Sequence, residues 1–227
     1  MVADLPAGAD DWTCLADALL IRAAVRFRAR RDRSPDPFAG LHIDAATADR
    51  LIGELLGSED RPLDGDEALD KAVDEARVQF AADLGRHSPF AALVGAASVG
   101  REEAEVLSLL CAVELDPRRA QLVAYLNDDV TRRRPTLHLL RSLFDVDHPG
   151  ALAVAGDARL SRAELVEVAG EGPWADRSVS VHDTVIWALA GDRSPDPALP
   201  VGLMTLVAPD ESPGGAPLVV VAGGDRV

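Results

Sequence analysis

The side chains that most often perform catalysis are scattered along this chain of 227 residues. The histidines follow neither the HExxH pattern of zinc proteases nor another paired spacing; they are His42, His87, His138, His148 and His182. The serines lack the GxSxG setting of a nucleophile elbow. Cys14 and Cys111 lie inside apolar helical patterns, without the basic neighbours or the helix start that would activate a thiol. The sequence therefore predicts no catalytic residue.

The densest group of potential metal ligands is formed by Asp145, Asp147 and His148. Ligands so close together in sequence cannot all converge on one ion, and helix ends commonly collect such residues. A role at a helix end is therefore favoured over a metal site, and no metal-binding residue is predicted.

An apolar run that leads into two glycines, PLVVVAGGDR, occupies Pro217–Arg226. It resembles the first strand of a nucleotide-binding domain as that strand enters its phosphate loop. A P-loop of the GxxxxGK[ST] type also needs a lysine and a hydroxyl to hold phosphates and Mg²⁺. Neither follows before Val227, and Lys71 is the only lysine of the chain. No cofactor-binding residue is predicted.

A charged segment, NDDVTRRRP at Asn127–Pro135, separates two predicted helices. In a helix-turn-helix unit, Arg132–Arg134 would precede the recognition helix and could contact DNA phosphates. Asp128 and Asp129 compete for the same arginines, however, and the following helix offers few groups that read bases. An internal Asp–Arg lock of the turn is the favoured interpretation.

The composition limits the classes of partner. The formal net charge of −15 repels nucleic acid and anionic membranes at long range. Two cysteines fit a reducing cytoplasm, the acidic N-terminus is unlike a signal peptide, and no apolar stretch approaches the roughly 18 residues of a membrane span. We therefore expect a cytoplasmic chain without membrane contact. Its partner would be another protein or a second copy of itself, and nucleic acid is disfavoured.

The first part of the chain has helical periodicity. Apolar residues at three- and four-residue steps predict three helices: 11–31, a segment between Asp44 and Gly57, and 67–84. Four arginines form one row along the first helix: Arg22, Arg26, Arg30 and Arg33. A solvated face is favoured for this row over a docking stripe for an acidic partner.

The second part has shorter elements. Helices are predicted to begin near Pro89, Glu102, Pro117 and Pro135, followed by two strands at 164–168 and 178–181 and a last helix opened by Ser180 and Asp183. The stretch 147–161 carries no clear pattern. Three short helices followed by a hairpin is the order of a winged-helix unit.

The predicted fold class is mainly α. An N-terminal helical subdomain is expected at residues 1–87, and a winged-helix-like unit with one β-hairpin at 88–192. Residues 193–227 are expected to form a linker and the start of a possible nucleotide-binding strand.

Several strings resemble a known family. Phe90–Phe144 contains FAALVGAASV, EEAEVLSLLCAVELD and LVAYLNDDVTRRRPTLHLL, which look like the winged-helix region N-terminal to the AAA+ module in a group of bacterial ATPases. VHDTVIWALAGD at Val181–Asp192 continues the likeness more loosely, and DPFAGLHID at Asp36–Asp44 fits the N-terminal extension of the same group. Members of this group include the ATPase of extracellular contractile injection systems.

The resemblance implies ATP and Mg²⁺ binding, and ATP hydrolysis, in the complete family protein. This chain has neither a Walker A lysine nor a Walker B strand, so no ATPase residue is carried over. The expected function is a non-catalytic recognition or assembly region of an AAA+ ATPase, with a link to a contractile injection system. The first alternative is a winged-helix DNA-binding transcriptional regulator, and the second is a small enzyme.

Overall fold

The computed structural model describes residues 11–31, 45–56 and 65–192. In chain order these residues form η1 (Asp11–Thr13), α1 (Cys14–Arg31), α2 (Ala45–Leu56), α3 (Asp66–Leu84), α4 (Pro89–Ala96), α5 (Arg101–Leu115), α6 (Pro117–Leu126), α7 (Leu137–Leu143), η2 (Gly150–Val154), α8 (Arg159–Arg162), β1 (Val166–Ala169), η3 (Trp174–Asp176), β2 (Ser178–Val181) and α9 (Asp183–Leu189), where η marks a 3₁₀ helix. The predicted cap Asp44, the predicted stop Gly57, the string Asp36–Asp44 and the tail Pro217–Arg226 lie outside the described residues.

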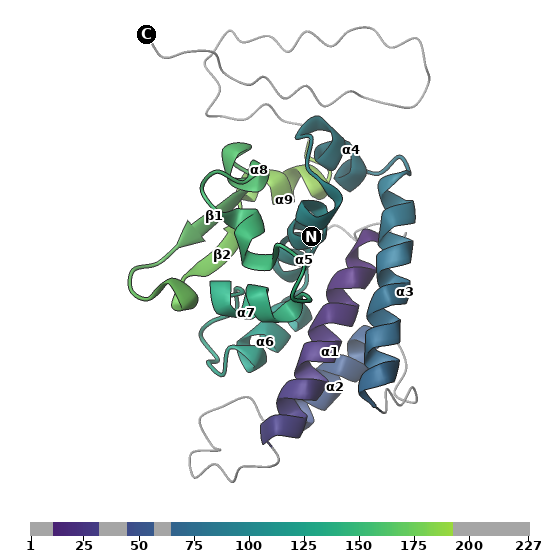
Figure 1. Ribbon diagram of the computed structural model, residues 1–227, viewed down its shortest axis with the longest axis vertical. Helices are drawn as coiled ribbons and strands as arrows, with labels where there is room; N and C mark the ends of the chain where they lie inside the picture. Colours follow the sequence, from purple (N-terminus) through teal and green to yellow (C-terminus); the bar gives the residue numbers. More distant parts are fainter. Residues whose placement is uncertain (1–10, 32–44, 57–64, 193–227) are drawn as a thin grey trace, which may run out of the picture.

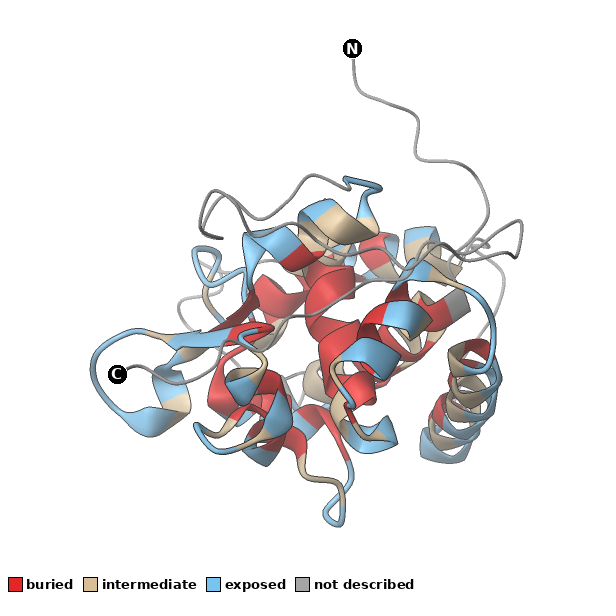
Figure 2. Ribbon diagram, turned by 90° about the horizontal axis from the view of Figure 1, so that it is seen from above, coloured by how far each residue is buried: buried red, intermediate tan, exposed pale blue. Residues whose placement is uncertain are grey.

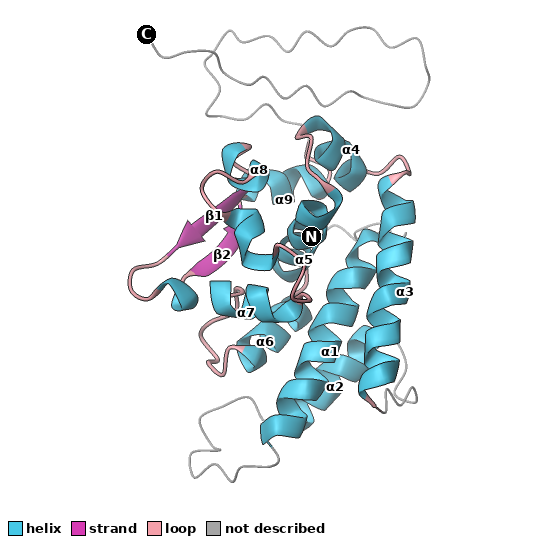
Figure 3. Cartoon of the chain, in the orientation of Figure 1, coloured by secondary structure: helices cyan, strands magenta, loops and turns pink. Residues whose placement is uncertain are grey.

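The fold is mainly helical, as predicted, with one two-stranded hairpin (Figure 1; Figure 3). Helices α1 and α3 run side by side, and α1 also packs against α5 and α6. The apolar face expected for the first helix is formed by Trp12, Leu15, Leu19, Ala23 and Phe27. The first three are buried, and Ala23 and Phe27 are partly buried against the same core.

Helix α5 lies at the centre of the molecule. Every residue from Ala104 to Val113 is buried, so α5 is surrounded on all sides, and Figure 2 shows the buried segments gathered in the interior. The helix begins where the Glu103 carboxylate accepts a hydrogen bond from the Gly100 amide at 3.0 Å. This contact satisfies one of the amide groups that a helix start leaves without a partner.

The cap expected before α6 is confirmed. Pro117 occupies the first helical position, where its missing N–H costs nothing, and the Asp116 carboxylate accepts from the Arg118 amide at 2.8 Å. Helix α7 begins two residues later than predicted. The Pro135 carbonyl accepts from the Val179 amide at 2.8 Å, which keeps this residue extended beside β2, and Thr136 caps the helix instead.

The predicted hairpin is present, with altered bounds. The strands are antiparallel, with Val166 opposite Val181 and Val168 opposite Val179. β1 starts after position 164 because the Leu165 amide donates to the Leu160 carbonyl and ends α8. Ser180 lies inside β2, so only Asp183 of the predicted pair opens α9.

One hydrophobic core extends from η1 to α9. Trp12 stacks on Phe90 with ring centroids 4.5 Å apart, and the Ser108 hydroxyl donates to the Trp12 carbonyl at 2.7 Å. Residues on either side of position 87 therefore share a single core. The predicted boundary between an N-terminal subdomain (1–87) and a winged-helix-like unit (88–192) stays a prediction.

Candidate functional site

The outer face of α7 presents a short polar stripe. His138, Arg141 and Ser142 are exposed, whereas the other residues of the helix face the core. Positions three and four apart lie on one face of a helix, so these three side chains share a surface. The helix has only 7 residues, so its exposed face is small.

The turn before α7 is locked by Asp129. Its Oδ1 accepts hydrogen bonds from the Thr131 amide at 2.9 Å and the Thr131 hydroxyl at 2.6 Å, while Oδ2 lies 3.2 Å from Nε of Arg132. The Thr131 hydroxyl is the main cause that lowers the pKa of Asp129. The predicted Asp–Arg lock is therefore confirmed for this aspartate.

Asn127 ties the same turn from the other side, which the sequence did not indicate. Its side-chain amide donates to the carbonyls of Arg132 at 2.8 Å and Arg134 at 3.0 Å. Its Oδ1 accepts from the Thr136 hydroxyl at 3.2 Å, which connects the end of α6 to the start of α7. Asn127 stands at the end of α6, and asparagine at a helix end commonly forms side-chain-to-backbone hydrogen bonds. Its position in the sequence could therefore have indicated this role.

The three arginines of the turn are in different environments. Arg132 reaches Asp129 and also Asp176 of the hairpin at 3.4 Å, and Arg134 lies 2.9 Å from Glu114. Arg133 is exposed, and its side chain contacts no carboxylate among the described residues. Two of the three guanidinium groups are thus already paired within the molecule.

The loop of the hairpin projects away from the helices (Figure 1). Gly170 and Gly172 have φ of 108° and 104°, in the region that glycine adopts at no steric cost, and η3 follows. Trp174 of η3 is 48% exposed, and Val168 of β1 is 37% exposed. The hairpin therefore presents a large aromatic ring to solvent near its tip.

The charge on the hairpin is negative. Its exposed charged side chains are Glu167, Glu171, Asp176 and Arg177. The whole segment 88–192 carries ten arginines and sixteen aspartates and glutamates. The winged-helix-like unit is thus acidic by itself, apart from the charge of the helices before it.

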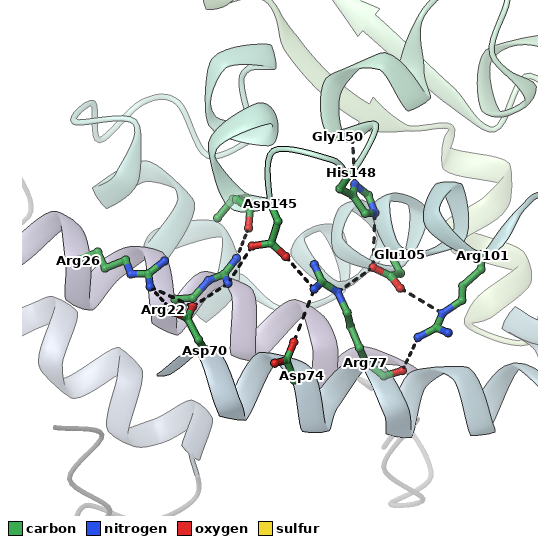
Figure 4. A network of polar contacts seen from close by, with 11 residues as sticks. Arg22, Arg26, Asp70, Asp74, Arg77, Arg101, Glu105, Asp145, His148 and Gly150 are labelled. Atoms are coloured by element: carbon green, nitrogen blue, oxygen red, sulfur yellow. Dashed lines mark hydrogen bonds and ion pairs between the residues drawn. The ribbon is translucent and has the colours of Figure 1, made fainter. Parts of the chain in front are cut away.

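The prediction that the arginine row on α1 forms a solvated face is wrong for Arg22 and Arg26. Only 7% of the Arg22 side chain is exposed, and its guanidinium donates to Asp70 at 3.0 Å, Asp145 at 3.3 Å and the Leu143 carbonyl at 2.8 Å (Figure 4). Arg26 pairs with Asp70 at 2.8 Å and with Asp66. These two positions bind within the molecule and leave no docking stripe there. Arg33 lies outside the described residues.

The group at 145–148 separates into different contacts. Asp145 lies 2.8 Å from Arg77, in addition to its contact with Arg22. Burial alone would raise the pKa of Asp145, but the hydrogen bond from Arg77 and the charges of both guanidinium groups hold it below its ordinary value. His148 faces Glu105, and Asp147 is exposed. Within the described ranges, no three His, Cys, Asp or Glu side chains are placed to share a metal ion.

The two cysteines and the lysine lie in or beside the packed helices. Cys111 is buried, and burial raises the pKa of its thiol well above the ordinary value. Cys14 is partly buried beside a groove of about 550 Å³ between α1, α2 and α3. Lys71 borders this groove and lies 3.7 Å from Glu75, one helical turn away. The Cys14 thiol donates to the Ala76 carbonyl of α3 at 3.8 Å.

A protein-family model described as "Winged helix domain, variant" matches residues 9–201. No curated protein and no solved structure matches the chain. Among the described residues, no helix is both long enough and apolar enough to cross a lipid bilayer.

Proposed function

The chain belongs to the variant winged helix domain family, and from that premise we propose that its hairpin and α7 face form a protein-recognition surface. In this proposal the chain is the non-catalytic recognition or assembly region of an AAA+ ATPase. Support for the ATPase comes from the likeness of Phe90–Phe144 to the region before the AAA+ module in that group, which includes the ATPase of contractile injection systems.

The observation that carries the proposal is the exposed ring of Trp174 on a hairpin with surplus negative charge. Tryptophan is among the residues most enriched in the energetically dominant positions of protein interfaces. A hairpin that lies along DNA needs cations to neutralise phosphates, since that term supplies most of the affinity. Here the hairpin offers three carboxylates and one arginine. A protein partner that covers Trp174 fits this surface better than a phosphate backbone does.

Site-specific photo-crosslinking tests this proposal. A benzophenone amino acid replaces Trp174 in the native host, and the same group replaces Val78, which is 71% exposed on α3, as the matched control. We expect protein adducts from position 174 that position 78 does not give. An adduct with a protein that carries a Walker A motif supports the ATPase link. Equal adducts from both positions would remove Trp174 as a recognition residue.

A second candidate function, a DNA-binding regulator, is favoured by one observation. Arg133, His138 and Arg141 are exposed near the start and along the outer face of α7, and none contacts a carboxylate among the described residues. Fluorescence polarisation with a labelled duplex at physiological salt decides between the two. A complex tighter than about 1 μM that is lost in Arg133→Ala would favour the regulator, because specific DNA complexes are usually much tighter than this. We expect no such complex.

A further inference from the structure

A network of polar contacts connects α1, α3 and α5 with the segment between α7 and η2 (Figure 4), and its buried members are Arg22, Glu105 and His148. Its members are Arg22, Arg26, Asp70, Asp74, Arg77, Arg101, Glu105, Asp145 and His148. Cations and carboxylates alternate along it, so each charge has an opposite neighbour. His148 stands at one end of the network, and its imidazole ring can hold either one proton or two.

The hydrogen bonds of His148 define which nitrogen carries the proton. The Gly150 amide donates to Nδ1 of His148 at 3.0 Å. A nitrogen that accepts a hydrogen bond carries no proton, so the ring is the neutral tautomer with its proton on Nε2. Nε2 lies 3.4 Å from Oε2 of Glu105, without the alignment of a good hydrogen bond.

The surroundings hold the ring in this orientation. Only 7% of the His148 side chain is exposed, and the ring stacks on Phe144 with centroids 4.1 Å apart and an interplanar angle of 9°. Gly150 has φ of 48°, and a Cβ there would lie 3.5 Å from the Arg141 Cα atom. The turn is therefore packed against the end of α7, and the Gly150 amide has a fixed direction toward Nδ1.

A second proton on the ring can bind only at Nδ1, because Nε2 already carries one. The new N–H would then face the N–H of Gly150 across the same 3.0 Å, with no acceptor between two donors. A buried amide that faces a second donor, with no acceptor, destabilises the conformation that holds it there. Protonation of the ring therefore disfavours the closed turn.

The charged groups around the ring act in opposite directions. From α5, Glu105 favours the imidazolium, and Arg101, 3.4 Å from Oε1 of Glu105, opposes it. From α3, Arg77 opposes it, since its Nε lies 3.3 Å from the same Glu105 oxygen. Asp145, on the segment that carries His148, is already engaged by Arg77. After the Gly150 contact breaks, a charged ring would share the Oε2 atom of Glu105 with Arg77.

We infer that His148 is a proton-operated latch on the turn between α7 and η2. The neutral ring holds the Gly150 amide and keeps the turn closed, and protonation releases the amide while the ring stays paired with Glu105. Because η2 packs against α7, α5 and β1, release of the turn loosens the support of α7 and of the hairpin. This inference does not depend on the identity of the partner.

Nuclear magnetic resonance of the full chain tests the latch. At about pH 8, ¹⁵N spectra of the ring should show the proton on Nε2, and the Gly150 amide should be protected from hydrogen exchange. As the pH is lowered, the normalised protection of Gly150 should begin to fall when the ring can bind its second proton, and it should reach its lowest value when the ring has bound it in all molecules, as linkage to one proton requires. The Gly150 amide shift should follow the same curve as the ring.

His148→Asn provides the matched variant, since its Oδ1 can accept from the Gly150 amide at the place of Nδ1 but does not titrate. Protection of Gly150 should then be independent of pH. His138→Gln removes an exposed histidine of α7 and should leave the Gly150 response unchanged. A proton on Nδ1 at pH 8, or titration of His148 without any change in Gly150 protection, overturns the latch.

Discussion

The guanidinium of Arg22 lies 3.3 Å from the carboxylate of Asp145, across 123 residues of sequence. The same group donates to the Leu143 carbonyl. Leu143 is the last residue of α7, so no later amide of the helix can donate to this carbonyl. A side chain from the first long helix thus satisfies the C-terminal end of α7. This contact connects the start of the chain to the helix that would face a partner.

Arg22→Ala should lower the free energy of unfolding by about 2–3 kcal/mol. Removal of one member of a buried charge pair is expensive because its partners stay behind, although Asp70 and Asp145 are half-exposed and can regain water. Urea unfolding followed by circular dichroism measures the change. Arg30→Ala, at an exposed position of the same helix, should change stability by less than about 0.5 kcal/mol.

Short-range signals explain which parts of the fold could be predicted. Asp116 and Pro117 define a helix start by themselves, because the cap and the proline act within one turn. Arg22 could not be placed in the same way, since its burial depends on Asp70 and Asp145, which are distant in sequence. Elements as short as η2 and α8 leave no periodic pattern. Their stretch therefore read as irregular.

The candidate site was only partly visible for a similar reason. The Asp129 lock is local, with partners two and three residues away, and the sequence predicted it. The exposure of Trp174 depends on where the hairpin lies relative to the helices, which no local pattern encodes. A tryptophan beside Gly172 and Pro173, in a turn with no apolar periodicity, was the signal that could have indicated it.

Glu164→Gly should stabilise the protein by about 1 kcal/mol. Glu164 is exposed with φ of 53°, a left-handed conformation in which a side chain costs roughly 1–2 kcal/mol. It follows α8 in the position that Gly191, with φ of 96°, occupies after α9. The reciprocal variant Gly191→Ala should destabilise by a similar amount. Thermal unfolding of both measures the effect, and a loss of stability in Glu164→Gly would contradict this account.

Asp129→Ala should lower the unfolding midpoint at neutral pH. The folded-state pKa of Asp129 is lowered, mainly by the hydrogen bond from the Thr131 hydroxyl. The ionised carboxylate therefore stabilises the folded state at pH values above its unfolded-state pKa. This stabilisation is lost as the pH falls through the folded-state pKa. The difference in midpoint between wild type and variant should therefore shrink in acid. Asp147→Ala, exposed after α7, is the control. A difference that grows in acid would show that Asp129 acts in another way.

Trp12→Ala should lower the free energy of unfolding by about 3–5 kcal/mol and leave a single transition. Trp12 is 3% exposed, stacks on Phe90 and receives the Ser108 hydroxyl at its carbonyl, so it is part of the packing on both sides of position 87. If the described helices fold as one unit, urea unfolding followed by far-ultraviolet circular dichroism and by tryptophan fluorescence should give coincident curves, and Trp12→Ala should shift both together.

Trp187→Ala, at a position 63% exposed on α9, keeps the core intact and should leave the free energy of unfolding within about 0.5 kcal/mol of wild type. Two separate transitions, of which Trp12→Ala moves only the first, would mean that residues 1–87 and 88–192 fold as independent units in spite of the core that they share.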